Sequence, residues 1–394
     1  DPLRELVPGD ALGGVVLIAC AVVAMSWANS PWSTTYFGAL STYVPVILGP
    51  VELKLSVLHW INDLVMAVFF LVVGLEIKRE FLAGELKDPR RAALPIAGAL
   101  GGMLVPALIY VAFNQGGPGA NGWGIPMATD IAFSLGVLSL LGRGIPRGIS
   151  VFLAALAIAD DLGAVLVIAL FYTANVDLGA LWVAGGLTLL LFMLQFMGVK
   201  RLSIYLAIAP FLWYSMYVSG VHATIAGVLL GWTIPLGKAG DSDISDSPLE
   251  TLEHALKPWV AWVVMPLFAL ANAGVAMRGM SLASLAEPVA SGVGLGLLLG
   301  KPIGIIALSF ITVRLGWARL PRGAGWLQVA GVGMLAGIGF TVALFVASLS
   351  FKGAGDLEPL AKVGILTAST IAGVTGALFL RWGLSRAPAE DAQA

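Results

Sequence analysis

An apolar run from Gly148 to Thr173 carries two adjacent carboxylates in its middle, Asp160 and Asp161. The run is long enough to cross a bilayer as a helix. Its thirteen Leu, Ile, Val and Phe residues each favour insertion by roughly 0.3 to 0.6 kcal/mol, whereas each central Asp opposes it by roughly 2.5 to 3.5 kcal/mol. Because these contributions nearly cancel, other parts of the protein must hold this helix in place. Acids kept at such a depth usually act on ions or protons.

The composition assigns the whole chain to the membrane. Hydrophobic residues make up 58% of the 394 residues and charged residues 11%, compared with about 25% charged residues in an ordinary soluble domain. We therefore expect an all-α polytopic membrane protein that forms a single integral domain over residues 1–394. The net charge of −1 indicates no nucleic-acid partner, and the single cysteine, Cys20, excludes an intramolecular disulfide and a cysteine metal cluster. No cofactor is indicated.

Twelve spanning segments are predicted, and the distribution of basic residues supports this count. The segments centre near residues 20, 68, 103, 131, 160, 188, 210, 228, 265, 299, 338 and 370. With this count and a cytoplasmic N-terminus, sixteen Lys and Arg residues lie at cytoplasmic ends and three, Lys54, Arg278 and Lys352, lie on the other side. Positive charge accumulates on the cytoplasmic side of membrane proteins. Both termini are therefore predicted to be cytoplasmic.

Two connections between the predicted spans have distinct patterns. In VELKLSV, apolar residues alternate with Glu52, Lys54 and Ser56 after a Gly49-Pro50 turn, which predicts a small extramembrane β-hairpin at about residues 43–57. An irregular loop is the alternative. The cytoplasmic loop at residues 237–248 is polar and acidic, and Ser247-Pro248-Leu249-Glu250 at its end predicts the start of a helix.

Two of the predicted spans look interrupted. NGWGIPMATDIAF places Gly and Pro residues just before Thr129 and Asp130, and GMLAGIGFTVALF places three glycines before Thr341. Helix breaks at membrane depth are tolerated where the freed backbone is buried in protein or lines a watery cavity. Such breaks in both halves of a transporter point to its binding site. Ordinary glycine-rich helix packing is the alternative for either segment alone.

The intramembrane charges suggest specific partners. Asp160 and Asp161 lie about 100° apart around their helix, so we expect Asp161, on a stripe of small residues, to face the ion cavity and Asp160 to lean towards a partner. Lys301, in the middle of GLGLLLGKPIG, is the expected partner because a lone buried ammonium would lose its proton or need a counter-ion. Asp130, beside a break, can neutralise the partial positive charge of exposed helix N-termini.

Two further charged clusters lie at predicted cytoplasmic ends. Glu76, Arg79 and Glu80 fall on one helical face in GLEIKREF, and Glu253, His254 and Lys257 begin the ninth predicted span. A solvated ion-pair face is the plainer interpretation of both clusters. If a cation-binding cavity opens to this side, they could instead sense protons.

Eight strings in this order resemble the NhaA-type sodium/proton antiporters of bacterial inner membranes. They are HWINDLVMAVFFLVVGLEIKREF, PMATDIAFSLGVL, ALAIADDLGAVLVIA, SGVHATIAGV, LEHALKPW, PLFALANAGV, GKPIGI and AGIGFTVALF, and they extend over nearly the whole chain. The rule that relates paired helix breaks to a binding site was itself drawn partly from this family. Two departures are Lys257, where family members can have His, and WINDLV in place of WINDGL.

The resemblance implies a fold of twelve transmembrane helices with an inverted-topology repeat and two broken, crossing helices. It further implies that Asp161 binds the cation, that Asp160 pairs with Lys301, and that Thr129 and Asp130 lie in the unwound part of the fourth helix. The residues matching the family's cytoplasmic pH-response cluster are Glu76, Arg79, Glu80, Glu253 and His254. The hairpin resembles the element that builds the family's dimer.

From the charges and the resemblance together we expect an electrogenic, pH-regulated antiporter that is not an enzyme. It would exchange cytoplasmic Na⁺ or Li⁺ for external protons in the bacterial inner membrane, as a homodimer in the lipid bilayer. A sodium-coupled symporter of an organic solute is the nearest alternative. A cation channel would need rings of ligands around a symmetry axis. An intramembrane aspartyl protease would need two acids from facing helices, whereas Asp160 and Asp161 are neighbours on one helix, and the GxGD string at residues 353–356 lies between two predicted spans.

Overall fold

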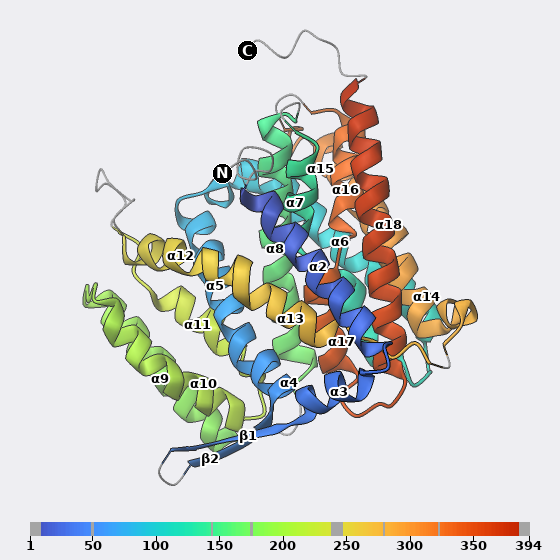
Figure 1. Ribbon diagram of the computed structural model, residues 1–394. Coiled ribbons are helices and arrows are strands. Elements are labelled where there is room, and N and C mark those ends of the chain that lie inside the picture. The colour runs from blue at the N-terminus through green and yellow to red at the C-terminus, as the bar shows by residue number, and fades with distance from the viewer. Residues whose placement is uncertain are drawn as a thin grey trace, which may run out of the picture. The chain divides into compact units, whose positions relative to one another are not determined.

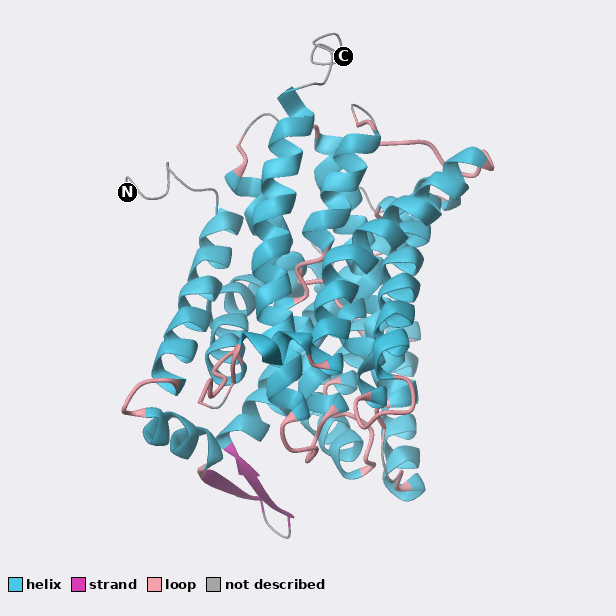
Figure 2. Ribbon diagram, turned by 90° about the vertical axis from the view of Figure 1, so that its right-hand side faces the viewer, coloured by secondary structure: helices cyan, strands magenta, loops and turns pink. Residues whose placement is uncertain are grey.

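The computed structural model describes residues 9–48, 51–142, 145–173, 176–237, 247–278, 280–321 and 324–385. Helices make up most of these residues (Figure 2). Within the ranges just given, eight helical segments are long and apolar enough to cross a membrane, or up to ten if each of two bent helix pairs counts as one span. This confirms a helical protein with many candidate spans. Residues 238–246 of the predicted cytoplasmic loop lie outside the described residues.

The chain divides into two compact units. The first comprises the chain up to Val22, Glu85–Ala164 and the chain from Val275, and the second comprises Val23–Gly84 and Val165–Gly274. Two long helices contribute residues to both units: α2 (Gly9–Ala28) and α8 (Arg147–Phe171) (Figure 1).

The first unit contains the two longest helices, α6 and α18. Besides α2 and α8, its elements are η2 (Glu85–Lys87), α6 (Pro89–Asn114), η3 (Ala120–Met127), α7 (Ile131–Leu140), η6 (Leu282–Ala286), α14 (Pro288–Leu295), η7 (Gly296–Gly300), α15 (Lys301–Arg314), α16 (Trp326–Ala336), α17 (Phe340–Ser350) and α18 (Leu357–Ser385). Every residue from Phe340 to Ala347 is buried, so α17 is enclosed on all sides. A helix that is apolar all round fits such a central position.

Close contact of α6 and α15 depends on two glycines. A Cβ atom on Gly101 would overlap the backbone carbonyl of Gly304, and one on Gly304 would overlap that of Gly101. The two helix backbones therefore touch at this point, as small residues allow in membrane helix pairs. This contact lies one turn along α15 from Lys301.

The second unit contains the two described strands. Its elements are α3 (Ser33–Ser41), β1 (Tyr43–Leu48), β2 (Val51–Ser56), α4 (Val57–Trp60), η1 (Ile61–Val65), α5 (Met66–Leu82), α9 (Leu178–Phe196), α10 (Leu202–Val218), α11 (Ile225–Thr233), α12 (Pro248–Trp259), η5 (Val260–Val264) and α13 (Met265–Asn272). The expected start of a helix after the cytoplasmic loop is confirmed, since Ser247 accepts a hydrogen bond from the backbone N–H of Glu250 at the start of α12.

The predicted β-hairpin is confirmed. Strands β1 and β2 pair antiparallel, with Tyr43 opposite Ser56 and Leu48 opposite Val51. Leu53 and Leu55 are buried while Lys54 is exposed, as the alternation of apolar and polar residues requires. Ser56 then accepts a hydrogen bond from the N–H of His59 and so caps the start of α4.

In the described parts of the chain, three wide π-helical turns interrupt the long helices, and the sequence had not predicted them. They are η1, η5 and η7. Two of the three come shortly before a proline, Pro266 after η5 and Pro302 after η7. Proline has no backbone N–H to donate to the preceding turn, which favours a local departure from α-helical geometry. The turn η7 ends directly at Lys301.

Candidate functional site

Two interrupted helices meet in the first unit. The extended residues Ala128 to Asp130 separate η3 from α7, and residues Gly337 to Gly339 separate α16 from α17, where the helix axis bends by 45°. The backbone N–H of Asp130 donates to the carbonyl of Ile338 at 2.7 Å, so one break satisfies a backbone group of the other. Both interruptions expected from the glycine and proline pattern are present, and they lie in direct contact.

The Asp130 carboxylate accepts hydrogen bonds from the first turns of two helices. Its Oδ1 accepts from the backbone N–H of Phe133 at 3.0 Å in α7, and its Oδ2 accepts from the N–H of Thr341 at 3.1 Å in α17. The Thr341 hydroxyl also donates to Oδ2. Unpaired N–H groups give a helix N-terminus partial positive charge, which a buried carboxylate can balance. This is the contact expected of Asp130.

Lys301 forms a buried ion pair with Asp160. The Lys301 ammonium donates to Asp160 Oδ2 and to the hydroxyl oxygen of Thr129, and all three residues are buried. The Thr129 hydroxyl contacts Asp160 Oδ2 and also lies 3.1 Å from the carbonyl oxygen of Ala336. It has a single hydrogen, so it can donate to one of these two acceptors at a time. The expected pairing of Lys301 with Asp160 is present.

Neighbouring elements hold Lys301 at this position. It is the first residue of α15 and follows the π-turn η7. A Cβ atom on Gly337 would lie 2.6 Å from the carbonyl oxygen of Leu297, so η7 packs directly against the break between α16 and α17. The π-turn, the broken helix and the lysine therefore form one packed group.

Asp160 keeps an acceptor available beside this ion pair. Its Oδ1 is buried and has no hydrogen-bond partner within the described parts of the chain. Asp161 is buried as well, with 5% of its surface exposed. A buried carboxylate oxygen without a donor suits a cation, since hard cations prefer oxygen ligands. That Asp161 faces an ion cavity stays a prediction.

The second unit holds the other predicted group, a charge cluster between α5 and α12. Lys257 lies 3.0 Å from Glu76 and 2.8 Å from Glu253, and Arg79 lies 3.0 Å from Glu253 and 3.5 Å from Glu80. The two sequence clusters thus form a single network, with the buried Glu253 between two cations. Lys257 joins the two helices, a role that its sequence position did not reveal.

His254 and Lys78 make contacts that the sequence did not predict. His254 is exposed, and its Nδ1 lies 2.8 Å from the carbonyl oxygen of Glu250. Lys78, one of the sixteen basic residues assigned to cytoplasmic ends, is buried and donates to the carbonyls of Trp232 at 2.6 Å and Ile234 at 2.5 Å. It binds the C-terminal end of α11, where a cation is favourable.

Many apolar spans, two touching helix breaks and a buried acid–lysine pair together define a polytopic membrane transporter with an ion-coupled site. The fold agrees with this class. The chain is similar to the solved sodium proton antiporter MjNhaP1 from Methanocaldococcus jannaschii, with a TM-score of 0.56 and 13% identity over 96% of each chain. At that identity the likeness concerns the fold alone.

The chain belongs to the Na⁺/H⁺ antiporter 1 family, and the sequence model of this family matches residues 4–380. It is 52% identical over 373 residues to the Na⁺/H⁺ antiporter NhaA 2 of Pseudomonas syringae pv. syringae, covering 94% of this chain and 93% of that protein. It is also 51% identical over 392 residues to the Na⁺/H⁺ antiporter NhaA of Caulobacter vibrioides, covering 99% and 92%. The predicted family is confirmed.

Proposed function

We propose that this protein exchanges cytoplasmic Na⁺ or Li⁺ for external protons across a bacterial inner membrane. The observation that carries the proposal is the buried Asp160–Lys301 ion pair beside two touching helix breaks. The named relatives are sodium/proton antiporters, which agrees with this activity. The comparisons give no support to the alternative of a sodium-coupled symporter.

Exchange would work by competition for carboxylates. When the site faces a cytoplasm of high pH, Asp161 and Asp160 lose their protons and Na⁺ or Li⁺ binds between them. The cation then replaces the Lys301 ammonium at Asp160, and Lys301 is released from Asp160 or deprotonated. The neighbouring Oδ1, which has no described partner, offers a further ligand. When the site faces outward, protons displace the cation and the ion pair forms again. Thr129 can follow this change because its hydroxyl can turn from Asp160 towards the carbonyl of Ala336.

The cycle would move net charge. Two carboxylates and a lysine can together release more than one proton for each monovalent cation that binds, so more protons than cations would cross per cycle. Transport would then be electrogenic and driven by both the proton gradient and the membrane potential. Asp130 would act at the same place by balancing the N-termini of α7 and α17 rather than by binding the cation directly.

The network of Glu76, Arg79, Glu80, Glu253 and Lys257 would adjust transport to the cytoplasmic pH. Its three carboxylates and two cations join α5 to α12, so protonation of a carboxylate would loosen a connection between helices. His254, exposed on the same helix α12, would belong to the same pH-response group.

The chain would form twelve transmembrane helices as an inverted-topology repeat, with both termini in the cytoplasm. The hairpin β1–β2 would join two copies into a homodimer. It is suited to this because a two-stranded sheet has unpaired edges and because Tyr43 and Ile47 are largely exposed.

A vesicle assay tests the activity. In everted membrane vesicles energised to an acidic interior, added Na⁺ should release protons from wild-type vesicles without any organic solute, and Asp161→Asn should abolish this release. Asp177→Asn is the matched control, because Asp177 caps α9 through a hydrogen bond from Ala180 that asparagine can also accept. Normal exchange by Asp161→Asn would exclude Asp161 as the site, and proton uptake coupled to Na⁺ entry would indicate symport.

A further inference from the structure

A cavity of about 1220 Å³ lies in the first unit, and its lining residues are distinct from those of the ion site. It is lined by the first turns of α6 and α8, by Glu85, and by residues 316–321 after the end of α15. These three helices belong to candidate membrane spans. The cavity therefore lies where spans end, on the side that carries the excess of arginine and lysine in the sequence.

The cavity is strongly basic. Four arginines and one glutamate line it: Arg90, Arg91, Arg147, Arg319 and Glu85. Arg91 lies 3.8 Å from both Glu85 and Asp88. Among the described residues, no ion pair engages the other three arginines. The positive charge of the cavity thus exceeds what its own carboxylate can balance.

The N-terminus of α8, which begins at Arg147 and has 25 residues, adds to this positive potential. The N-terminus of α6 at Pro89 is already capped by Asp88, whose carboxylate accepts a hydrogen bond from the N–H of Arg90. The first backbone N–H groups of a helix lack intrahelical acceptors and favour an anion. Guanidinium groups bind the oxygens of phosphate in a bidentate manner. The cavity therefore has the donors that a phosphate group requires.

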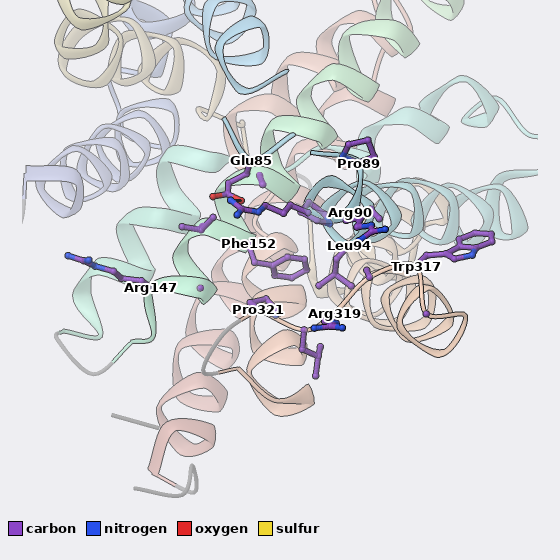
Figure 3. A pocket seen from close by; sticks show the side chains of 18 residues that line it. Glu85, Pro89, Arg90, Leu94, Arg147, Phe152, Trp317, Arg319 and Pro321 are labelled. Carbon is purple, nitrogen blue, oxygen red and sulfur yellow. Dashed lines mark ion pairs between the residues drawn. The ribbon is translucent and has the colours of Figure 1, made fainter. Parts of the chain in front are cut away.

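The floor and the rim of the cavity are apolar. Leu94, Phe152 and Val151 line it together with Trp317, whose side chain is 68% exposed. Figure 3 shows Leu94 near the guanidinium groups of Arg90 and Arg319, with Phe152 on one side and Trp317 on the other. An inorganic ion would contact the arginines alone, whereas an amphiphile would contact both kinds of surface.

We propose that this cavity binds the headgroup of an anionic phospholipid. The phosphate would lie on Arg90 and Arg319 near the start of α6, and the first part of an acyl chain would lie along Phe152, Leu94 and Trp317. The volume exceeds the roughly 300–1,000 Å³ of ordinary small-molecule pockets, so a headgroup and the start of its chains fit. Basic pockets between membrane helices are suited to anionic headgroups. The site does not depend on the proposed ion exchange.

Lipid retention by the full-length purified protein tests the proposal. Native mass spectrometry would follow binding from equimolar phosphatidylglycerol and phosphatidylcholine with identical chains. Wild type should retain phosphatidylglycerol preferentially, and each of Arg90→Gln and Arg319→Gln should weaken that binding about tenfold, the usual effect of losing one charged hydrogen bond. Arg381→Gln, an exposed arginine of α18 outside the cavity, should leave retention unchanged.

Three results would overturn the site. Equal retention of both lipids by wild type would exclude charge recognition, and unchanged retention in the Arg90→Gln, Arg319→Gln double variant would place the lipid elsewhere. Inorganic phosphate that displaces phosphatidylglycerol and raises the melting temperature as much would make this a site for free anions. Should the double variant unfold, Arg90→Lys with Arg319→Lys keeps the charge but removes bidentate contacts. It should lose part of the preference, and full retention would contradict the proposal.

Discussion

The ammonium of Lys301 has three hydrogens to donate, and Thr129 and Asp160 accept two of them. Neither charge could stay buried without the other, because an unpaired ion in a low-dielectric interior loses its hydration without compensation. This requirement explains why the lysine and the acid could be matched from the sequence, although they are 141 positions apart. Asp160 and Lys301 therefore pair because both charged groups are buried.

Removal of the lysine should therefore destabilise the protein. Lys301→Ala should lower the free energy of unfolding by about 3–5 kcal/mol, the usual effect of leaving a buried partner unpaired. It should also shift the pH profile of exchange. Thermal unfolding in detergent measures the first effect, with the exposed Lys54→Ala as the control. An unchanged melting temperature together with an unchanged pH profile would remove Lys301 from the mechanism.

Lys78 shows where reasoning from single residues fails. The distribution of basic residues assigned it to a cytoplasmic end and named no partner for it. In the structure it is buried against the carbonyls that end α11. The acceptors are backbone groups more than 150 positions away, and backbone groups leave no signature in side-chain composition. Lys257 was placed correctly on its helix, but its contact with Glu76 depends on how α5 and α12 pack.

The packing of α6 against α15 is a property of two elements, and one substitution tests it. Gly304→Ala should destabilise the protein by about 2 kcal/mol or more, because the added methyl group overlaps the backbone of Gly101. Gly294→Ala, in the neighbouring helix α14, is the control. A Cβ there would meet nothing within 4 Å, so this change should be neutral or stabilising. Equal melting temperatures of the two variants would contradict the close contact.

Helix breaks and π-turns differ in how well the sequence predicts them. Both breaks were predicted because glycine and proline accumulate at them, and the hairpin was predicted because its residues alternate. The π-turns were missed because they keep helical backbone angles, and the phase shift of about 100° from one added residue is hidden where nearly every residue is apolar, as in η5 and η7. Pro302 and Pro266 are the available signals, since each removes an N–H from the turn before it.

For the whole molecule, hydropathy alone does not determine the number of membrane-spanning helices. α10 has 17 residues and α11 has nine, whereas about 20 are needed to cross the hydrocarbon core as a straight helix. Both segments were expected as spans because their composition is apolar. Composition reports that a segment avoids water, but not how many of its residues are helical.

The proposed homodimer depends on the β1–β2 hairpin. Ile47→Arg should convert a dimer to a monomer, because it places a charge on an exposed apolar position of β1. Light scattering coupled to size exclusion in detergent measures the mass. Trp32→Arg, at another exposed apolar residue in the same connection, should leave the dimer intact. A monomeric wild type, or two variants that remain dimeric, would show that the hairpin does not join the copies.

Competition between a cation and protons for Asp160 and Asp161 is the central claim, and proton release measures it directly. Purified protein in weakly buffered detergent, at a pH where exchange is active, should release protons when Na⁺ is added and take them up when Na⁺ is removed. Asp161→Asn should release none, while Asp177→Asn should match wild type. Undiminished release by Asp161→Asn, or no release by wild type, would contradict the account.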